Sequence, residues 1–267
     1  MLVFNVLGSG GLQQPAPPVE QDEPLIVRNL RDTFQGIEAL PTDTPVDPSR
    51  LQEAWNDALK FKEDALAAFR LGYLSLKERS MAEQLTWACA RALLDRLHDV
   101  AKLPDDLKTL PAVLAETYYA NLSIFRSAPD TWAIQQLFPL MPLHRLNEKP
   151  TRLGHFADLT CDSDGKLNRF INDGQHKPLL ELHPLKPNEP YLIGMFLGGA
   201  YQEVMGNLHN LFGSTDAAHI RLAPGGEYQV DHVVRGDTNA DVLEMMEHDP
   251  DQLLERLRMA SEKAISS

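Results

Sequence analysis

Residues 156–165 read FADLTCDSDG and are the most informative stretch of the chain. A short apolar run, typical of a strand, ends in Cys161, and the carboxylates Asp162 and Asp164 follow before a glycine. Gly165 allows a tight turn that reverses the chain. Few structural needs require a thiol and two carboxylates at the end of a strand. We therefore take this stretch as the first candidate for chemistry.

The same residues also fit a polar turn that only closes the strand, because Asp and Ser side chains bond nearby backbone groups. If they are functional, the carboxylates can bind a cation, and one carboxylate can take two charge-assisted bonds from a guanidinium. The thiol can be a nucleophile or a proton donor. Adjacent carboxylates disfavour the thiolate, which favours the proton donor. Hydrolysis by Asp162 and Asp164 has weaker support, because nothing indicates a sugar cleft.

Composition and charge narrow the class of protein. The 267 residues are 43% hydrophobic and 24% charged, which is ordinary for a soluble globular protein. A net charge of −13 argues against nucleic acid or an anionic membrane as a partner, since both require a basic face. No apolar run approaches the roughly 20 residues that span a bilayer, and the start lacks the basic segment of a signal peptide. We expect a cytoplasmic protein.

Three other patterns do not indicate a site. The two cysteines and nine histidines have no metal-ligand spacing, so no metal ligand is assigned. Cys89 lies on an apolar i, i+4 stripe and is expected to pack in a core. The sequence GSG at 8–10 does not make a dinucleotide loop, because Gln13 replaces the third glycine and no helix follows.

The first half of the chain predicts a helical subdomain. Residues 1–8 are expected to form a strand, and the Gly- and Pro-rich range 9–47 a flexible loop. Asp47-Pro48 is a helix N-cap followed by proline, and residues 75–78 have the form of a capping box. With a third helix at about 107–118, the range 48–118 predicts antiparallel helices.

After residue 119 the pattern is mixed, so the fold class is α+β. The elements expected here are strands at 119–125 and 156–160, a helical turn at 131–138, an extended segment from 190 that becomes helical near 200–203, a hairpin of 218–222 with 228–234, and acidic helices over 238–264. Five glycines within 194–213 suit close approach of backbone to a ligand. Tyr201 can donate its hydroxyl to a phosphate, or it can be a buried tyrosine bonded to backbone.

Together, DLTCDSDG at 158–165, GAYQE at 199–203 and GNLHNLFG at 206–213 resemble the biosynthetic arginine decarboxylases. DTWAIQQLFP at 130–139 and LVFNV at 2–6 extend the resemblance. It implies a pyridoxal-phosphate enzyme of the alanine racemase-like fold type III. Residues 119–236 would be its C-terminal β-domain, 48–118 its helical insert and 237–267 a shortened helical extension. The family's (β/α)8 barrel, with the lysine that forms the Schiff base, is expected to be absent.

The resemblance also implies roles for individual residues. Cys161 would return a proton to the substrate carbon after carbon dioxide leaves. Asp162 would hold the guanidinium of L-arginine, with Asp164 as a second carboxylate, and Tyr201 would contact the phosphate of pyridoxal phosphate. The site would be shared between subunits, so a dimer, a tetramer or a barrel-containing chain is the expected partner. The family also uses Mg²⁺.

Two functions from different classes follow. The first is the C-terminal portion of an arginine decarboxylase, which makes agmatine for polyamine biosynthesis but is inactive alone. The alternative is a catalytically silent assembly or regulatory module that pairs with a full-length decarboxylase.

Overall fold

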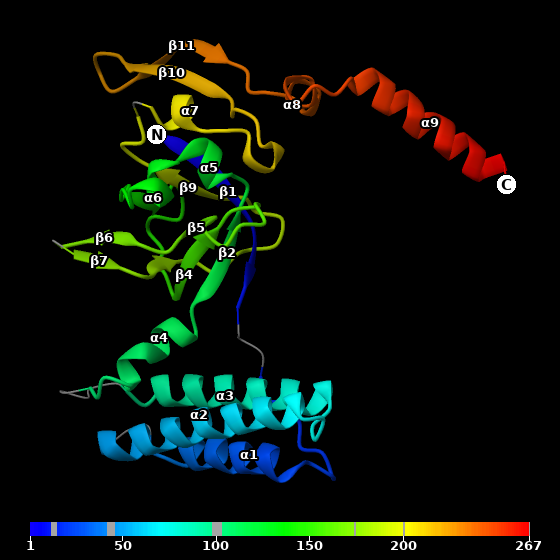
Figure 1. Cartoon of the computed structure of the whole chain (residues 1–267). Coiled ribbons are helices and arrows are strands. Elements are labelled where there is room, and N and C mark those ends of the chain that lie inside the picture. Colours follow the sequence, from blue (N-terminus) through cyan, green and yellow to red (C-terminus); the bar gives the residue numbers. More distant parts are fainter. Residues whose placement is uncertain (12–14, 42–45, 98–102, 174, 200, 267) are drawn as a thin grey trace.

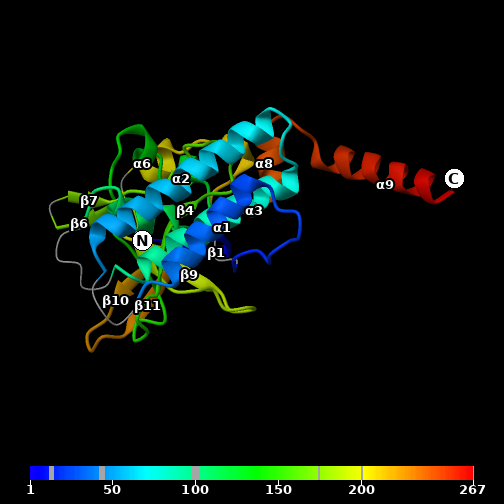
Figure 2. The same ribbon diagram turned by 90° about the horizontal axis from the view of Figure 1, so that it is seen from below.

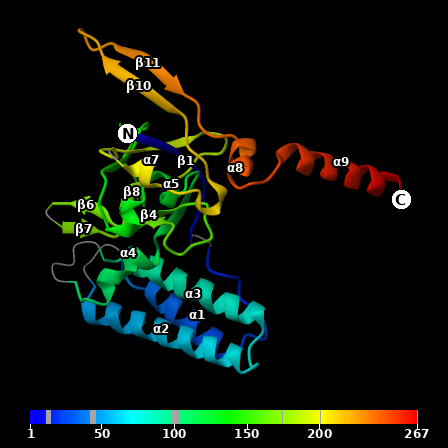
Figure 3. The ribbon, with the colours of Figure 1, turned by 45° about the horizontal axis from the view of Figure 1, so that its top comes forward.

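The computed structural model describes residues 1–11, 15–41, 46–97, 103–173, 175–199 and 201–266. A bundle of helices lies at one end of the molecule, and a β-domain with short helices lies beside it (Figure 1). The chain begins in the β-domain, passes through the bundle and returns. A hairpin and a long helix extend from the far side of the β-domain (Figure 3).

The bundle has three long helices, α1 (Leu25–Glu38), α2 (Pro48–Arg70) and α3 (Leu76–Leu94), which lie side by side (Figure 2). The short elements η1 (Leu107–Thr109) and α4 (Leu110–Val113) follow. Apolar faces of all three long helices are buried together, with Leu30, Trp55 and Leu85 at most 1% exposed. Burial of such a shared apolar face supplies most of the stability of helices in proteins.

Two helix starts in the bundle follow the sequence prediction. Asp47 caps α2 by accepting a hydrogen bond from Ser49 N at 3.0 Å. At α3, Ser75 Oγ accepts from Glu78 N, and a Glu78 carboxylate oxygen accepts from Ser75 N at 2.6 Å. Each cap satisfies backbone donors that have no partner within the helix. The predicted N-cap and capping box are confirmed.

The prediction of a loop over 9–47 was wrong for its central part, where α1 forms; residues 12–14 and 42–45 lie outside the described residues. α1 follows Pro24 and has no side-chain cap, so a local start signal is lacking. Helix α1 is instead stabilised by contacts with residues outside the helix. The buried Arg31 forms an ion pair with Glu23 and donates to the carbonyls of Pro17 and Pro18 at 2.8 and 3.1 Å.

The β-domain is a seven-stranded sheet in the order β3-β9-β1-β2-β4-β5, with β8 also paired to β4. Its strands are β1 (Leu2–Gly10), β2 (Glu116–Ala120), β3 (Leu140–Pro142), β4 (Arg152–Ala157), β5 (Lys166–Leu167), β8 (Leu180–Leu182) and β9 (Tyr191–Met195). β1 is antiparallel to β9 and β2, whereas β2 and β4 are parallel. The buried rings of Phe4, Tyr118 and Phe156 form the centre of the core.

Two expectations near the start of β2 were wrong. The helix predicted over 107–118 ends at Val113, and the strand predicted over 119–125 occupies Glu116–Ala120 instead. The short helices α5 (Ile124–Ser127) and α6 (Asp130–Ala133) follow it. β2 lies between β1 and β4, and Tyr118 on it is fully buried. Pairing on both sides is a long-range effect that local propensity does not report.

The remaining elements are peripheral. β6 (Phe170–Asn172) and β7 (Gln175–Lys177) form a small hairpin, and α7 (Gln202–Met205) and η2 (His209–Leu211) lie near α5. The predicted hairpin is confirmed as β10 (Ala217–Leu222) and β11 (Tyr228–Val234), and the predicted acidic helices as α8 (Asn239–Met245) and α9 (Pro250–Ser266). Among the described residues, none of the helices combines the length and apolar character that crossing a membrane requires.

Candidate active site

The turn that follows β4 is built on a buried carboxylate. Asp158 accepts hydrogen bonds from Ile124 N at 2.9 Å, from Thr160 N at 2.8 Å and from Thr160 Oγ1 at 2.6 Å. Asp158 N in turn donates to Gly165 O at 2.8 Å, which closes the turn. A Cβ on Gly165 would lie 2.2 Å from an Asp158 carboxylate oxygen, so only glycine fits there. The turn is thus fixed from inside.

The predicted residues Cys161, Asp162 and Asp164 are exposed on the outside of this turn. The sequence placed Cys161 at the end of a strand, but β4 ends at Ala157 and the cysteine lies in the loop beyond it. The reason is that Asp158 bonds to Thr160 and bends the chain before Cys161. A loop position leaves the thiol accessible.

Cys161 and Asp162 both contact the segment that contains η2. His209 Nε2 lies in direct contact with Asp162 Oδ2 as a hydrogen-bonded pair, which becomes an ion pair if the imidazole is protonated. Asn210 Nδ2 lies 3.7 Å from Cys161 Sγ, and Asn210 Oδ1 lies 3.9 Å from it. Two neighbouring residues of one loop therefore contact two neighbouring residues of another. The carboxylate of Asp164, by contrast, has no hydrogen bond or ion pair within the described ranges.

The short helix α5 supports both loops. The ring of Phe125 lies 4.5 Å from that of His209 and 5.4 Å from that of Trp132, measured between centroids. Arg126 donates to the carbonyls of Glu203 and Gly206 at 2.6 and 3.1 Å and also bonds Ser214. The helix whose first N–H binds Asp158 thus also holds the chain on either side of His209.

Tyr201, the residue directly before α7, has an unusual backbone conformation. Its φ is +74°, which is uncommon for a bulky residue and marks strain of the kind found at functional sites. The side chain is 67% exposed, and its hydroxyl has no hydrogen-bond partner in the described part of the chain, so it is not the buried tyrosine that the sequence left open. The next residue, Gln202, exchanges hydrogen bonds with Asp130, which ties this segment to α6.

Sequence reasoning missed His209, Asn210 and Arg126 as members of this site. His209 and Asn210 lie within the glycine-bounded stretch GNLHNLFG, which indicated a ligand-binding segment but not which side chains matter. Their contacts cross 47 and 49 positions of sequence. A loop rich in Asn and His between two glycines was the available signal.

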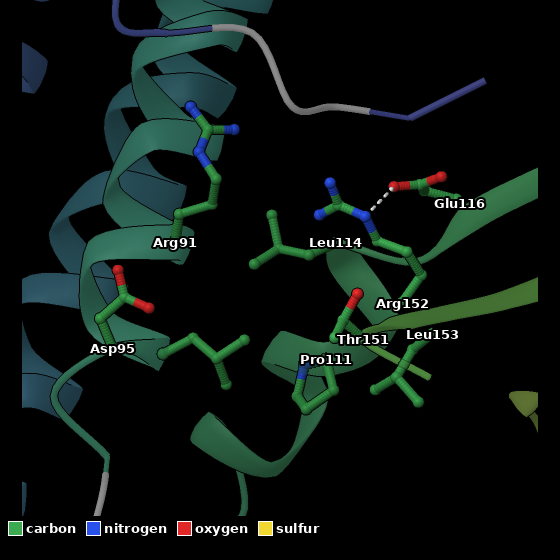
Figure 4. A pocket seen from close by; sticks show the side chains of 9 residues that line it. Arg91, Asp95, Pro111, Leu114, Glu116, Thr151, Arg152 and Leu153 are labelled. Atoms are coloured by element: carbon green, nitrogen blue, oxygen red, sulfur yellow. Dashed lines mark ion pairs between the residues drawn. The ribbon is translucent and has the colours of Figure 1, made fainter. Parts of the chain in front are cut away.

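A separate cleft lies between the bundle and the β-domain, lined by side chains from α3, α4, β2 and β4 (Figure 4). Within it Arg152 Nε lies 3.4 Å from a Glu116 carboxylate oxygen. None of the four predicted site residues lines this cleft. Its ion pair joins neighbouring strands and indicates a structural contact.

The second cysteine lies far from the Cys161 turn, in the core of the helical bundle. Cys89 is buried in the bundle, as expected, and burial raises the pKa of its thiol to about 12. Across the residues that the structure describes, no group of three or more His, Cys, Asp or Glu side chains is arranged to hold a metal ion.

Known proteins with similar sequences have been found for this chain. Residues 20–111 match the model of the arginine decarboxylase helical bundle domain. Biosynthetic arginine decarboxylases from Prochlorococcus marinus (strain MIT 9313) and Synechococcus sp. (strain RCC307) are each 69% identical over 265 and 268 residues, which is 99% and 100% of this chain. The chain covers only 41% and 40% of those proteins.

A solved structure resembles the fold. The crystal structure of the biosynthetic arginine decarboxylase SpeA from Campylobacter jejuni superposes with a TM-score of 0.75 at 32% identity. The match covers 96% of this chain and 39% of that one. Both the sequence and the structural matches therefore extend over nearly the whole chain and about two fifths of each relative.

Proposed function

We propose that the chain belongs to the family of the biosynthetic arginine decarboxylases and that it supplies a thiol and a carboxylate to an arginine decarboxylase active site. The proposed reaction converts L-arginine to agmatine and carbon dioxide for polyamine synthesis. One observation carries this proposal. Cys161 and Asp162 lie exposed on a turn that Asp158 fixes from inside, and both are held by the segment His209–Asn210.

The proposed cofactor is pyridoxal phosphate, which when bound accepts the electron pair left behind as carbon dioxide departs. Tyr201 suits its phosphate, because its exposed hydroxyl has no partner in the described part of the chain and can donate a hydrogen bond. We assign the lysine that binds the cofactor to the part of the longer relatives that this chain does not match. Mg²⁺ stays a family expectation, and no residue is assigned to it.

Cys161 is the proposed proton donor. Its S–H would deliver a proton to the substrate carbon that has lost the carboxylate, leaving a thiolate that regains a proton from solvent. The exposed position of the thiol allows that return. A positioned acid of this kind contributes about 10²–10⁴-fold to the rate.

Asp162 is the proposed anchor for the substrate guanidinium. Its Oδ2 contacts His209, which leaves Oδ1 to accept from arginine. Asp164 lies two residues further along the same turn and is exposed, so it can add a second negative charge for the same cation. A charge-assisted bond to a guanidinium is roughly twice as strong as a neutral hydrogen bond.

The proposed setting is an assembly of subunits. In the antiparallel register of β10 and β11, one face of the hairpin consists entirely of apolar residues. They are Ala218, Ile220, Leu222, Tyr228, Val230 and Val233. The five larger side chains are 48–79% exposed. A two-stranded hairpin is marginal on its own in water, which supports a partner over this face.

The test is complementation. The 267-residue chain is co-expressed with the part of the Prochlorococcus marinus relative that it does not match, and agmatine formation is measured with pyridoxal phosphate. We expect activity from the pair and none from the chain alone. Cys161→Ala should lower kcat by about 10²-fold or more. Cys89→Ala, the matched control, should leave kcat within about twofold, because the removed thiol is in the bundle core.

A silent assembly module is the second candidate, and the apolar hairpin face favours it equally. It predicts that the chain binds a full-length decarboxylase subunit without restoring or contributing activity. Full activity of the complemented pair carrying Cys161→Ala, or no activity with intact Cys161, would support this module and contradict the donated site.

A further inference from the structure

The carboxamide of Asn210 faces the thiol of Cys161 with both of its polar atoms. Nδ2 lies 3.7 Å from Sγ and Oδ1 lies 3.9 Å from it, distances within reach of sulfur hydrogen bonds. We propose that Asn210 is a positioning residue for Cys161, able to accept from the thiol and to donate to the thiolate. The meaning of this contact for catalysis rests on the function proposed above.

A thiol that donates a proton needs a hydrogen-bond partner both before and after the proton leaves. As S–H the thiol can donate to the amide oxygen, and as thiolate it can accept from the amide N–H. The N–H group of Asn210 gives the thiolate a donor at the moment when the proton has left. An aspartate of the same shape would place a negative charge there instead.

The backbone at this position also suits asparagine. Asn210 has φ +55°, in the left-handed region that asparagine tolerates better than most residues other than glycine. Glycine would fit the backbone but would bring no amide. Its neighbour His209 contacts Asp162 and packs on Phe125, so the loop is held against the Cys161 turn at two adjacent points.

The test measures alkylation of Cys161 by iodoacetamide in the purified chain, without cofactor or substrate. Thiolates are the reactive form, so the rate reports how well the thiolate is supported. Asn210→Asp keeps the size and backbone preference but replaces the donor with a charge. We expect the rate to fall roughly three- to tenfold, the effect of one charge about 4 Å from the sulfur.

The matched control is Asn188→Asp. Asn188 is also exposed and also has a left-handed backbone, with φ +61°, but it lies in the loop between β8 and β9. This variant has the same change of charge and should alter the rate by less than about twofold. Cys89 must stay unreactive in both proteins, which shows that each is folded.

An unchanged rate in Asn210→Asp, or equal slowing in both variants, would overturn the proposal. This outcome is separate from failure of the decarboxylase proposal, because no substrate turnover is measured. Slowed alkylation together with an inactive complemented pair would retain the role of Asn210 toward the thiol and reject the catalytic function.

Discussion

The two cysteines of this chain lie in regions that are stabilised in different ways. Cys89 is fully buried among apolar side chains of the helical bundle, and its pKa is raised to about 12 by burial. Cys161 is exposed on a turn that is held by hydrogen bonds and by contacts between loops. In the bundle, burial of the thiol contributes to stability and makes the thiol inaccessible. In the turn, the buried Asp158 fixes the backbone, and the thiol and the carboxylates point to solvent.

The largest expected effect is on thiol reactivity. Iodoacetamide should modify Cys161 in the folded chain at least about 10³ times faster than Cys89, because Cys89 reacts only after the bundle opens and opening costs several kcal/mol. Peptide mass analysis after timed quenching measures both rates. Denaturation in urea should bring them within about tenfold of each other. Comparable rates without urea would show that the bundle is not a cooperative core.

Next in size is removal of a bundle side chain. Leu85 is fully buried in α3, and Leu85→Ala should lower the free energy of unfolding by about 2–5 kcal/mol. Leu76 lies on the same helix and is 70% exposed, so Leu76→Ala is the matched control, with an expected change of less than about 0.5 kcal/mol. Urea denaturation followed by circular dichroism gives both values. Equal losses would mean that burial does not distinguish the two positions.

Gly165 tests how tightly the turn is built. In Gly165→Ala the new methyl group would lie 2.2 Å from an Asp158 oxygen and 2.5 Å from Thr160 Oγ1, and the resulting shift should cost about 1–3 kcal/mol. The rate of Cys161 alkylation should change as well, because the turn moves.

Gly36→Ala provides the opposite case for that experiment. Gly36 lies within α1, where an added Cβ meets nothing within 4 Å, so alanine should stabilise the chain by roughly 0.5–1 kcal/mol. Thermal denaturation measures both glycine variants. If neither substitution changed the thermal stability, the turn at Gly165 would have more room for a side chain than the structure gives it.

The same contrast explains what the sequence could predict. The capping box at Ser75 and Glu78 and the proline after Asp47 are local signals, and the helices they start were predicted correctly. α1 was missed because it has no side-chain cap and depends on Arg31, which bonds residues up to 14 positions away. Strand β2 was shifted because its two neighbours are remote in sequence.

In the candidate site, too, local features could be predicted from the sequence and long-range contacts could not. The residue types at Cys161, Asp162 and Asp164 were enough to select the turn, because a thiol and two carboxylates together are unusual. The pairing of Cys161 with Asn210 was not predictable, since it depends on where α5 places two distant loops. The roles given to the predicted residues, including Tyr201, stay predictions.

The smallest expected effect concerns the buried ion pair of the bundle. A hydrogen bond from Arg31 holds the pKa of Glu23 below its ordinary value, although burial opposes this. A lowered pKa in the folded state means that the stabilisation is complete above the unfolded value of about 4.3 and is lost as pH falls through the folded pKa. Glu23→Gln should therefore cost about 1 kcal/mol at pH 7, the difference between a charged and a neutral hydrogen bond.

That cost should shrink as the pH falls below the unfolded value of about 4.3, because the stabilisation is lost as the wild-type carboxylate takes up its proton. Glu20→Gln is the control, because its pair with Lys77 is exposed and should contribute less than about 0.5 kcal/mol at any pH. Urea titrations at pH 7 and pH 3.5 separate the two. A Glu23→Gln cost that is the same at both values would mean that the buried carboxylate contributes through packing and not through its charge, and the bundle would then differ even more from the polar turn that carries Cys161.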